Sequence, residues 1–354
     1  MEAKYQALAS ELRARIQTGD LAAGSLLPTE QMLCETYQVS RQTVRQALGV
    51  LVREHLIEKR QGSGSRVVDR AQMPAAEQRN IAVITTYISD YIFPSILREV
   101  EDVLSRNNCA TLLSATQNQV SNERMVLERL LSRDIDGVLV EGTKTALPNP
   151  NLDLYRKLDE CGVPLVFMNG NYPELTDAVS VLDDNFAGGY ALVEYLAGKG
   201  HTHIAGIFKS DDIQGTERYA GYIAAMRDLG LLTWDKHIFW YHTETKERFL
   251  SGAAAEPLLS ILPGCTAVVC YNDEIAGFLV NALLAQGTRI PEEMAVVSFD
   301  DGRYSELSPV RITSLSHGTK NVGRTAAEIL LRLMDGEPCQ SCQVPWVLNE
   351  KESS

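Results

Sequence analysis

Residues 28–55 read PTEQMLCETYQVSRQTVRQALGVLVREH, a pattern of two helices joined by a tight turn. The first helix is predicted to start near Thr29 and to end at a turn at Gln38–Val39. The second follows Ser40, whose hydroxyl can accept a hydrogen bond from an otherwise unpaired backbone amide. Its inward stripe, at helical spacing, is Val44, Leu48 and Leu51. The stretch therefore predicts a helix-turn-helix.

The inward stripe leaves Arg41, Gln42 and Arg45 on the outer face, near the amino end of the second helix. Arginine pairs with guanine through two hydrogen bonds, glutamine pairs with adenine, and the amino end of a helix attracts phosphate. These side chains therefore suit the major groove of DNA. Taken alone, they fit an ordinary solvated helix face equally well.

The segments on either side complete the pattern of a winged helix. Upstream, a helix that ends at Gly19 is predicted from apolar residues at helical spacing, namely Tyr5, Leu8, Leu12 and Ile16. Downstream, LIEKR, QGSG and SRVV indicate two short strands around a glycine turn, a hairpin with three basic residues, Lys59, Arg60 and Arg66. We therefore predict a small winged helix-turn-helix domain at residues 1–68.

Three motifs of this segment resemble the GntR-family DNA-binding head: Leu27-Pro28-Thr29-Glu30, Val39-Ser40-Arg41-Gln42-Thr43-Val44-Arg45 and Gln61-Gly62-Ser63-Gly64. The resemblance covers residues 1–70 and implies double-stranded operator DNA as a partner. It further implies contacts with the DNA backbone or bases by Lys4, Tyr5, Arg41, Thr43 and Arg45. Glu30 and Gln42 would help to read the sequence, and Gln61 and Gly62 would enter the minor groove.

The charge of the chain is divided unevenly. The 354 residues carry a net charge of −13, but residues 1–70 hold ten Lys and Arg against eight Asp and Glu, which leaves −15 for the rest. An acidic body repels phosphate. We therefore expect DNA contact to be confined to the first 70 residues and to depend strongly on salt.

Composition excludes several classes of protein. No stretch approaches the roughly 18 consecutive apolar residues of a membrane span. The amino-terminal residues MEAKYQALASELRARI are amphipathic and charged, unlike a secretory signal, so we expect a cytoplasmic protein. The seven scattered cysteines favour reduced thiols over a disulfide framework.

Metal and nucleotide sites are not expected. Cys339 and Cys342 form a CxxC pair, and His201 lies close to His203, but neither pair has further ligands at zinc spacing. The motifs GxGxxG and GxxxxGK[ST] do not occur. We therefore expect no metal and no cofactor.

Residues 69–80, DRAQMPAAEQRN, are polar, interrupted by proline and without periodicity, which is typical of a linker. In residues 81–354, short apolar runs alternate with amphipathic stretches, including helices predicted at 93–106 and near 123–132. Such alternation predicts an α/β domain with parallel sheets, and the chain is long enough for two doubly wound lobes.

Ligands of open parallel sheets bind at the carboxyl ends of the strands. The residues that follow the predicted strands are rich in carboxylates, amides and aromatic rings, which suit paired sugar hydroxyls. They are Asp90, Tyr91, Phe93, Glu141, Lys144, Asn169, Lys209, Arg218, Asn272, Asp273, Asp300, Asp301 and His317. An alternative is that such groups cap helices, above all Asp184, Asp273 and Asp301.

Three further motifs resemble LacI/GalR-type effector domains, which are similar to periplasmic sugar-binding proteins: Tyr271-Asn272-Asp273-Glu274-Ile275-Ala276, Val297-Ser298-Phe299-Asp300-Asp301 and Leu315-Ser316-His317. The resemblance spans about residues 80–350. It implies that Arg218, Asn272 and Asp300 bind the effector through hydrogen bonds, and that Tyr91 and Phe93 line the cleft from the amino-terminal lobe.

The run Thr85-Thr86-Tyr87-Ile88-Ser89-Asp90-Tyr91-Ile92-Phe93-Pro94-Ser95-Ile96 resembles the arabinose-repressor family of Gram-positive bacteria. This resemblance implies a homodimeric repressor of sugar-utilisation genes that L-arabinose releases from its operator. The expected effector contacts are Asp90, Tyr91, Phe93, Glu141, Lys209, Arg218, Asn272, Asp300 and His317. The terminal Arg-x-Ser of the family is replaced here by Lys351-Glu352-Ser353.

Other functions fit parts of the pattern. A repressor of the same architecture could respond to a different sugar, and the large domain alone would suit sugar transport. The adjacent acids Asp183–Asp184, Asp211–Asp212 and Asp300–Asp301 could imitate glycosidase carboxylates. Adjacent residues rarely face each other across a substrate, so we expect no enzyme.

Overall fold

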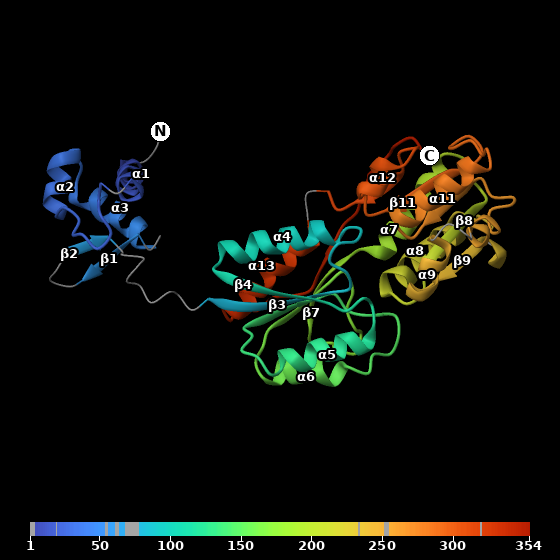
Figure 1. The fold of residues 1–354 in the computed structure, drawn as a ribbon. Helices are drawn as coiled ribbons and strands as arrows, with labels where there is room; N and C mark the ends of the chain where they lie inside the picture. Colours follow the sequence, from blue (N-terminus) through green and yellow to red (C-terminus); the bar gives the residue numbers. More distant parts are fainter. Residues whose placement is uncertain are drawn as a thin grey trace. The chain divides into compact units, whose positions relative to one another are not determined.

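The computed structural model describes residues 4–18, 20–53, 56–60, 64–67, 78–232, 234–250, 255–318 and 321–354. The chain divides into two compact units, Met1–Gln78 and Arg79–Ser354, and each is described by itself (Figure 1). Gln61, Gly62 and residues 69–77 of the expected linker lie outside the described residues. The large domain starts two residues earlier than predicted, because its first strand begins at Arg79.

The small unit contains the predicted elements of a winged helix. They are α1 (Lys4–Gln17), α2 (Glu30–Tyr37), α3 (Arg41–Arg53), β1 (Ile57–Arg60) and β2 (Gly64–Val67). Ser40 caps α3 as predicted, because its Oγ accepts a hydrogen bond of 3.2 Å from the amide of Thr43. Thr29 caps α2 in the same way. The two strands pair antiparallel.

The core of the small unit is the predicted inward stripe of α3 together with apolar residues of the other helices. Val44, Leu48 and Leu51 are at most 1% exposed. They belong to one cluster with Leu8 and Leu12 of α1 and with Leu33 of α2. This packing fixes which face of α3 is free to meet a partner.

The amino-terminal lobe of the large unit is a six-stranded sheet in the order β13-β7-β6-β5-β3-β4, in which all neighbours are parallel. Its strands are β3 (Arg79–Thr85), β4 (Cys109–Ala115), β5 (Gly137–Val140), β6 (Leu165–Met168), β7 (Val179–Asp183) and β13 (Cys342–Val344). One face is covered by α4 (Phe93–Arg106) and α13 (Val322–Met334), and the other by α5 (Val120–Leu130) and α6 (Leu152–Glu160) (Figure 1).

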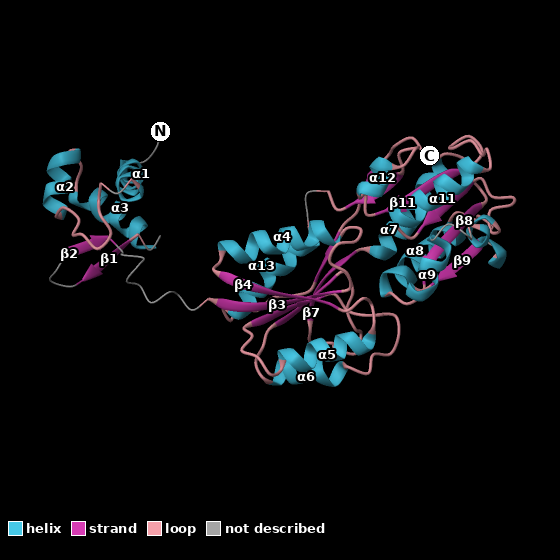
Figure 2. Ribbon diagram, in the orientation of Figure 1, coloured by secondary structure: helices cyan, strands magenta, loops and turns pink. Residues whose placement is uncertain are grey.

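The carboxy-terminal lobe repeats this arrangement with the order β14-β12-β11-β10-β8-β9, in which only β14 is antiparallel to its neighbour (Figure 2). Its strands are β8 (Ile204–Lys209), β9 (Ile238–Tyr241), β10 (Ala267–Cys270), β11 (Ala295–Phe299), β12 (Thr313–Ser316) and β14 (Val347–Asn349). One face carries α7 (Asn185–Gly198) and α8 (Ile213–Asp228), and the other carries α10 (Glu256–Leu259) and α11 (Asp273–Ala285). The remaining helices are α9 (Thr243–Leu250), α12 (Arg303–Leu307) and a 3₁₀ turn (Asp235–His237).

Burial explains why the strands could be predicted from apolar runs. Every residue of β5 and β10 is buried, as expected for strands covered by helices on both faces. The two-lobed α/β fold is therefore confirmed. The helix predicted at 93–106 has those bounds, whereas the helix predicted near 123–132 runs from Val120 to Leu130.

The carboxy-terminal segment is tied to the carboxy-terminal lobe. Lys351 Nζ lies 2.5 Å from Asp301 Oδ1 and 2.6 Å from Glu306 Oε1. Ser353 Oγ donates to the carbonyl of Val296 and accepts from the amide of Thr313 at 2.9 Å. Lys351 therefore supplies a partly buried positive charge at the position where the resembling family has arginine.

The crossing of α7 and α8 depends on glycine. A Cβ atom built on Gly189 would lie 2.0 Å from the carbonyl oxygen of Arg218, and one on Gly221 would lie 1.9 Å from that of Phe186. Since the clashing atoms belong to the backbone, any side chain at either position would push the helices apart. The close approach places Arg218 deep in the lobe.

We predict that Gly189→Ala lowers the free energy of unfolding by about 1–3 kcal/mol, the usual range for overpacking. The matched control is Gly198→Ala in the same helix, where an added Cβ meets no atom within 4 Å. That change should stabilise the helix by roughly 0.5–1 kcal/mol. Chemical denaturation measures both, and equal shifts for the two variants would contradict the close crossing.

Candidate functional site

A cavity lies between the two lobes of the large unit, at the carboxyl ends of strands from both sheets. Its empty volume is about 850 Å³ including the solvent at its mouth. Eight of the nine predicted effector contacts line it: Asp90, Tyr91, Phe93, Glu141, Lys209, Arg218, Asn272 and Asp300. The position of these residues was therefore predicted well, while their role in binding stays a prediction.

Arg218 forms the buried centre of the cavity wall and is 2% exposed. Its Nε donates to Asn185 Oδ1 at 2.9 Å, its Nη1 to the carbonyl of Tyr271 at 2.6 Å, and its Nη2 to Asp300 Oδ1 at 3.2 Å. The guanidinium also lies 4.2 Å from the centre of the Phe299 ring. Burial alone would lower the pKa of Arg218, but Asp300 raises it, so the side chain stays charged.

Tyr91 links the lobes across this wall. Its hydroxyl donates to Asp300 Oδ2 at 2.6 Å and accepts from the amide of Asp273 at 3.1 Å. Burial and the neighbouring carboxylates hold the pKa of Tyr91 well above its usual value. Tyr91 and Asp300 have φ angles of 55° and 90°, a conformation that non-glycine residues rarely adopt. Two strained residues thus meet at the contact between the lobes.

The capping alternative is correct for one of the three carboxylates. Asp184 caps α7 by accepting from the amide of Ala187. Asp273 does not cap α11, because the neighbouring Asn272 does so. Asp273 is instead fully buried and accepts from the amide of Gly302 at 2.6 Å, while burial and then Asp300 raise its pKa to about 8.

Asp301 is also not a cap, because Gly302 occupies the N-cap position of α12. Its carboxylate accepts from Asn349 Nδ2 at 2.5 Å and pairs with Lys351. Asp301 therefore holds the carboxy-terminal segment.

Glu141 and Lys209 are buried ionisable groups on opposite lobes. Glu141 Oε2 accepts from Thr85 Oγ1, from the amide of Thr86 and from Thr86 Oγ1, at 2.7 to 3.1 Å. Burial raises the pKa of Glu141. Lys209 Nζ lies 2.6 Å from Asp212 Oδ2, and although burial opposes its charge, Asp212 and Asp211 raise its pKa.

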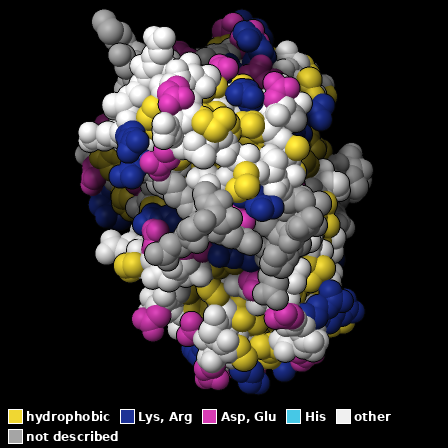
Figure 3. Space-filling view, turned by 90° about the vertical axis from the view of Figure 1, so that its left-hand side faces the viewer, with side chains coloured by type: hydrophobic (Ala, Val, Ile, Leu, Met, Phe, Trp, Pro, Cys, Tyr) yellow, Lys and Arg dark blue, Asp and Glu magenta, His cyan; other side chains and the backbone are white. Residues whose placement is uncertain are grey.

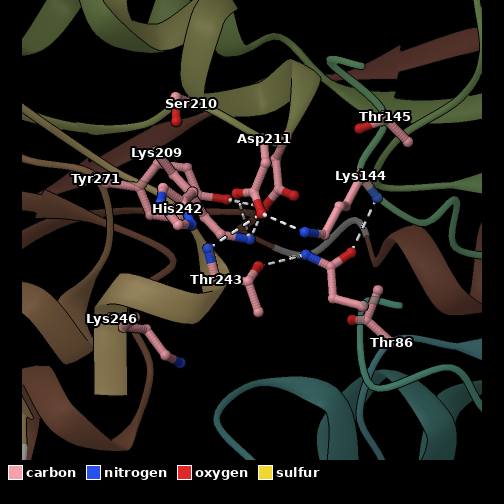
Figure 4. A network of polar contacts seen from close by, with 12 residues as sticks. Thr86, Lys144, Thr145, Lys209, Ser210, Asp211, His242, Thr243, Lys246 and Tyr271 are labelled. Carbon is pink, nitrogen blue, oxygen red and sulfur yellow. Dashed lines mark hydrogen bonds and ion pairs between the residues drawn. The ribbon is translucent and has the colours of Figure 1, made fainter. Parts of the chain in front are cut away.

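A polar network at the edge of the cavity also joins the lobes, and Figure 4 shows Lys144 and Lys209 pointing at the carboxylate of Asp211 from opposite sides. Lys144 Nζ also pairs with Glu244 Oε1. Asn118 Nδ2 donates to Thr243 Oγ1 at 2.5 Å. Lys144 and Asn118 belong to the amino-terminal lobe, and their partners belong to the other lobe.

The prediction for His317 needs correction, because it does not line the cavity. Its Nε2 instead lies 2.8 Å from Asp183 Oδ1, and Asp183 lines the cavity. His317 follows strand β12 as predicted, but its ring turns away to stack on Trp346.

Several residues of the cavity were missed: Thr86, Tyr87, Asn118, Asp183, Asp212, Gln214, Tyr241, Thr243 and Lys246. Asn118 and Thr243 follow the edge strands β4 and β9, so the rule that found the other residues would have found these two. Lys246 lies on α9 and has no such signal.

In the small unit, four of the predicted DNA contacts lie on α3: Arg41, Gln42, Thr43 and Arg45. Arg41, Gln42 and Arg45 are exposed, whereas Tyr5 packs partly against the core. Arg45 Nε donates to Glu30 Oε2 at 3.0 Å, so two predicted contacts pair with each other. Thr43 bonds to Ser40 at 2.9 Å. Lys4 begins α1, and its side chain lies outside the described residues.

Surface charge is mixed: in Figure 3, Lys and Arg side chains are interspersed with Asp and Glu side chains on the face shown.

Within the described residues, no group of three His, Cys, Asp or Glu side chains could hold a metal ion. The same residues include no helix long and apolar enough to cross a membrane.

Comparison with known proteins finds a matching family model for each of the two units. The family model "Bacterial regulatory proteins, gntR family" matches residues 4–67, and the "Periplasmic binding protein-like domain" model matches residues 193–354. The arabinose metabolism transcriptional repressor of Halalkalibacterium halodurans is 36% identical over 349 residues, which cover 95% of this chain and 91% of the relative. The protein of the same name from Geobacillus stearothermophilus is 34% identical over 340 residues, which cover 94% of this chain and 91% of the relative.

Solved structures with the same fold include the transcription regulator CcpA of Lactococcus lactis. It has a TM-score of 0.68 at 24% identity and covers 78% of this chain and 100% of that chain. A LacI-type transcriptional regulator from Alkaliphilus metalliredigens, complexed with D-xylulofuranose, has a TM-score of 0.67 at 21% identity. The match covers 78% of this chain and 99% of that chain.

The winged-helix head and the two-lobed body define a transcription regulator with a GntR-type head and a LacI-type body. The chain belongs to the family of arabinose metabolism transcriptional repressors. The prediction of a DNA-binding repressor is thereby confirmed.

The ion pair between Lys144 and Glu244, which joins the lobes, predicts a shifted pKa for Glu244. Lys144 lowers the pKa of Glu244 from its usual 4.5 to about 2, and His242 adds to the effect. We predict that Lys144→Met moves the pKa of Glu244 back towards 4.5, as measured by ¹³C NMR titration of the side-chain carboxylates. Lys157→Met, which removes an ion pair with Asp153 within one lobe, is the control and should leave Glu244 unchanged. An unaltered pKa in Lys144→Met would show that this contact does not form in solution.

Proposed function

We propose that this repressor responds to L-arabinose, which binds in the cavity between the lobes. The observation that carries the proposal is that the cations of the cavity wall have carboxylate partners: Arg218 with Asp300, Lys209 with Asp212 and Lys246 with Glu274. A ligand therefore meets paired charges, which suit a neutral molecule with several hydroxyl groups. The names of the two relatives described above support arabinose among such molecules.

The mechanism needs binding but no chemistry. In our proposal, two copies associate through the body and place two heads on the half-sites of a near-palindromic operator, in the cytoplasm. Arg41, Gln42, Thr43 and Arg45 contact the major groove. Sugar favours a closed arrangement of the lobes, and the operator is released if that arrangement binds DNA less well, with a coupling of about 1–3 kcal/mol.

Fluorescence anisotropy of a labelled fragment from the promoter of the chain's own gene tests the proposal, with and without L-arabinose at fixed salt. Tight binding that L-arabinose relieves and D-glucose does not is the expected result. Binding that ignores L-arabinose would overturn the effector assignment and leave the repressor intact.

The head is tested by Arg45→Ala, which should weaken operator binding by about 1–3 kcal/mol and leave sugar affinity unchanged. Arg106→Ala is a matched control, because both side chains are 69% exposed and each pairs with one carboxylate. Equal operator affinity in the two variants would remove Arg45 from the DNA interface.

The cavity is tested by Arg218→Lys, which keeps a charge beside Asp300 but cannot make the three hydrogen bonds of the guanidinium. The lost hydrogen bonds, worth about 1.5–3 kcal/mol each to stability, hold Asp300 and the Tyr271 backbone in the cavity wall. Because these groups would then be displaced, L-arabinose binding should weaken at least about tenfold, or about 1.4 kcal/mol. Operator binding without sugar should stay as in the wild type. Calorimetry measures the first quantity and anisotropy the second, and unchanged sugar affinity would exclude Arg218 from the site.

A further inference from the structure

Three segments connect the two lobes, and each carries one member of a side-chain cluster. The segment from β7 to α7 starts at Asp183, the segment from β12 to α13 contains His317, and the segment from β13 to β14 contains Trp346. No property of the sequence suggested that these residues meet, because they are separated by up to 163 positions.

The members of this Asp183–His317–Trp346 cluster are in direct contact. His317 Nε2 lies 2.8 Å from Asp183 Oδ1, and the His317 ring stacks on Trp346 with centroids 4.6 Å apart and planes at 28°. Trp346 also packs against Gly188 of α7, where an added Cβ would lie 2.7 Å from Trp346 Cδ1. The three connecting segments are therefore held to one another by side chains.

The cluster borders the cavity through Asp183, which is 3% exposed. Its Oδ1 faces His317. The close ionic contact of Oδ1 with His317 Nε2 does not have regular hydrogen-bond geometry. Asn185 Nδ2 donates to the backbone carbonyl of Asp183, and among the described residues no donor is bonded to the second carboxylate oxygen, Oδ2. A carboxylate oxygen accepts strongly from a hydroxyl group. One acceptor on the cavity wall is therefore open to a ligand.

We propose that Asp183 accepts a hydrogen bond from a sugar hydroxyl through Oδ2, and that protonated His317 is the positioning residue that holds Asp183 and ties the three connecting segments together. The inference rests on the proposed function and extends it. Sugar binding is thereby linked to the protonation of His317 in one of the three connecting segments.

The charges around His317 determine the direction of the pH effect. Burial alone would lower its pKa, but Asp183 and Asp300 raise it, Arg218 opposes them, and the net change is upward. On its open side, His317 borders a groove that also holds Arg98, Asp301, Arg303 and Glu306. Its side chain is 21% exposed, so it can exchange protons with solvent.

The raised pKa of His317 determines whether sugar affinity rises or falls with pH. Below the ordinary histidine pKa of about 6.5, His317 is charged in every state. As the pH rises through the raised pKa, the proton is lost and the contact with Asp183 weakens. Sugar affinity should therefore be highest near pH 6 and should fall towards pH 9.

Calorimetric titration of the full-length protein with L-arabinose between pH 6.0 and 9.0 tests the proposal. The wild type should lose affinity about fivefold or more over this range, the lower end of typical coupling between sites. His317→Gln keeps a hydrogen-bond donor but cannot be protonated, so its affinity should not vary with pH. Asp183→Asn should bind at least about tenfold more weakly at pH 6.0 and should also lack the pH dependence.

The matched control is His203→Gln, at the amino end of β8 and away from the strand ends that form the cavity, which should keep the wild-type profile. NMR titration of His317 is a second readout that does not depend on affinity. Its pKa should be raised in the wild type, raised further by L-arabinose and lowered by Asp183→Asn.

The outcomes separate the two proposals. Wild-type binding without pH dependence, or a His317→Gln variant that keeps the wild-type slope, would overturn this inference and leave the proposed function standing. A His317 pKa that ignores Asp183→Asn would also overturn it. Absence of L-arabinose binding at every pH would overturn the proposed effector, and this inference with it.

Discussion

The buried guanidinium of Arg218 is the interaction on which the body depends. A cation removed from water is tolerated only when its hydrogen bonds are satisfied, and here the partners come from α7, from the end of β10 and from the segment after β11. Those three elements are consequently fixed relative to one another. Asp300, held by Arg218 on one oxygen, presents its other oxygen to Tyr91 of the opposite lobe.

The two kinds of contact between the lobes respond differently to their surroundings. The bond between Tyr91 and Asp300 is partly buried, so dissolved ions screen it less than an exposed pair. The pair between Lys144 and Glu244 lies at the edge, where Glu244 is 54% exposed, and contributes little at physiological salt. Ionic strength should therefore alter the edge of the cavity more than its centre.

Local rules predicted much of the molecule. The helix-turn-helix follows from the spacing of Val44, Leu48 and Leu51 and from the cap at Ser40. The strand-end rule located part of the cavity wall, including Arg218, Asn272 and Asp300. The rule fails where neighbours compete: Asn272 and Asp273 are both good caps, and only burial in the fold assigns the cap to Asn272. The strand-end rule also gives the position of a residue but not the direction of its side chain: His317 follows β12, yet its ring stacks on Trp346. The link from Tyr91 to Asp300 joins residues 209 positions apart through left-handed backbone, which no local pattern encodes.

The close crossing of α7 and α8 has an evolutionary consequence. Gly188, Gly189 and Gly221 touch backbone or aromatic rings, so a mutation to any larger residue displaces the frame that carries Arg218. The loops that line the cavity also include exposed positions such as Asp90, which other side chains can occupy more easily. New ligand preferences can therefore arise by drift in these loops while the glycines stay fixed, so one scaffold can give rise to a lineage of regulators for different small molecules.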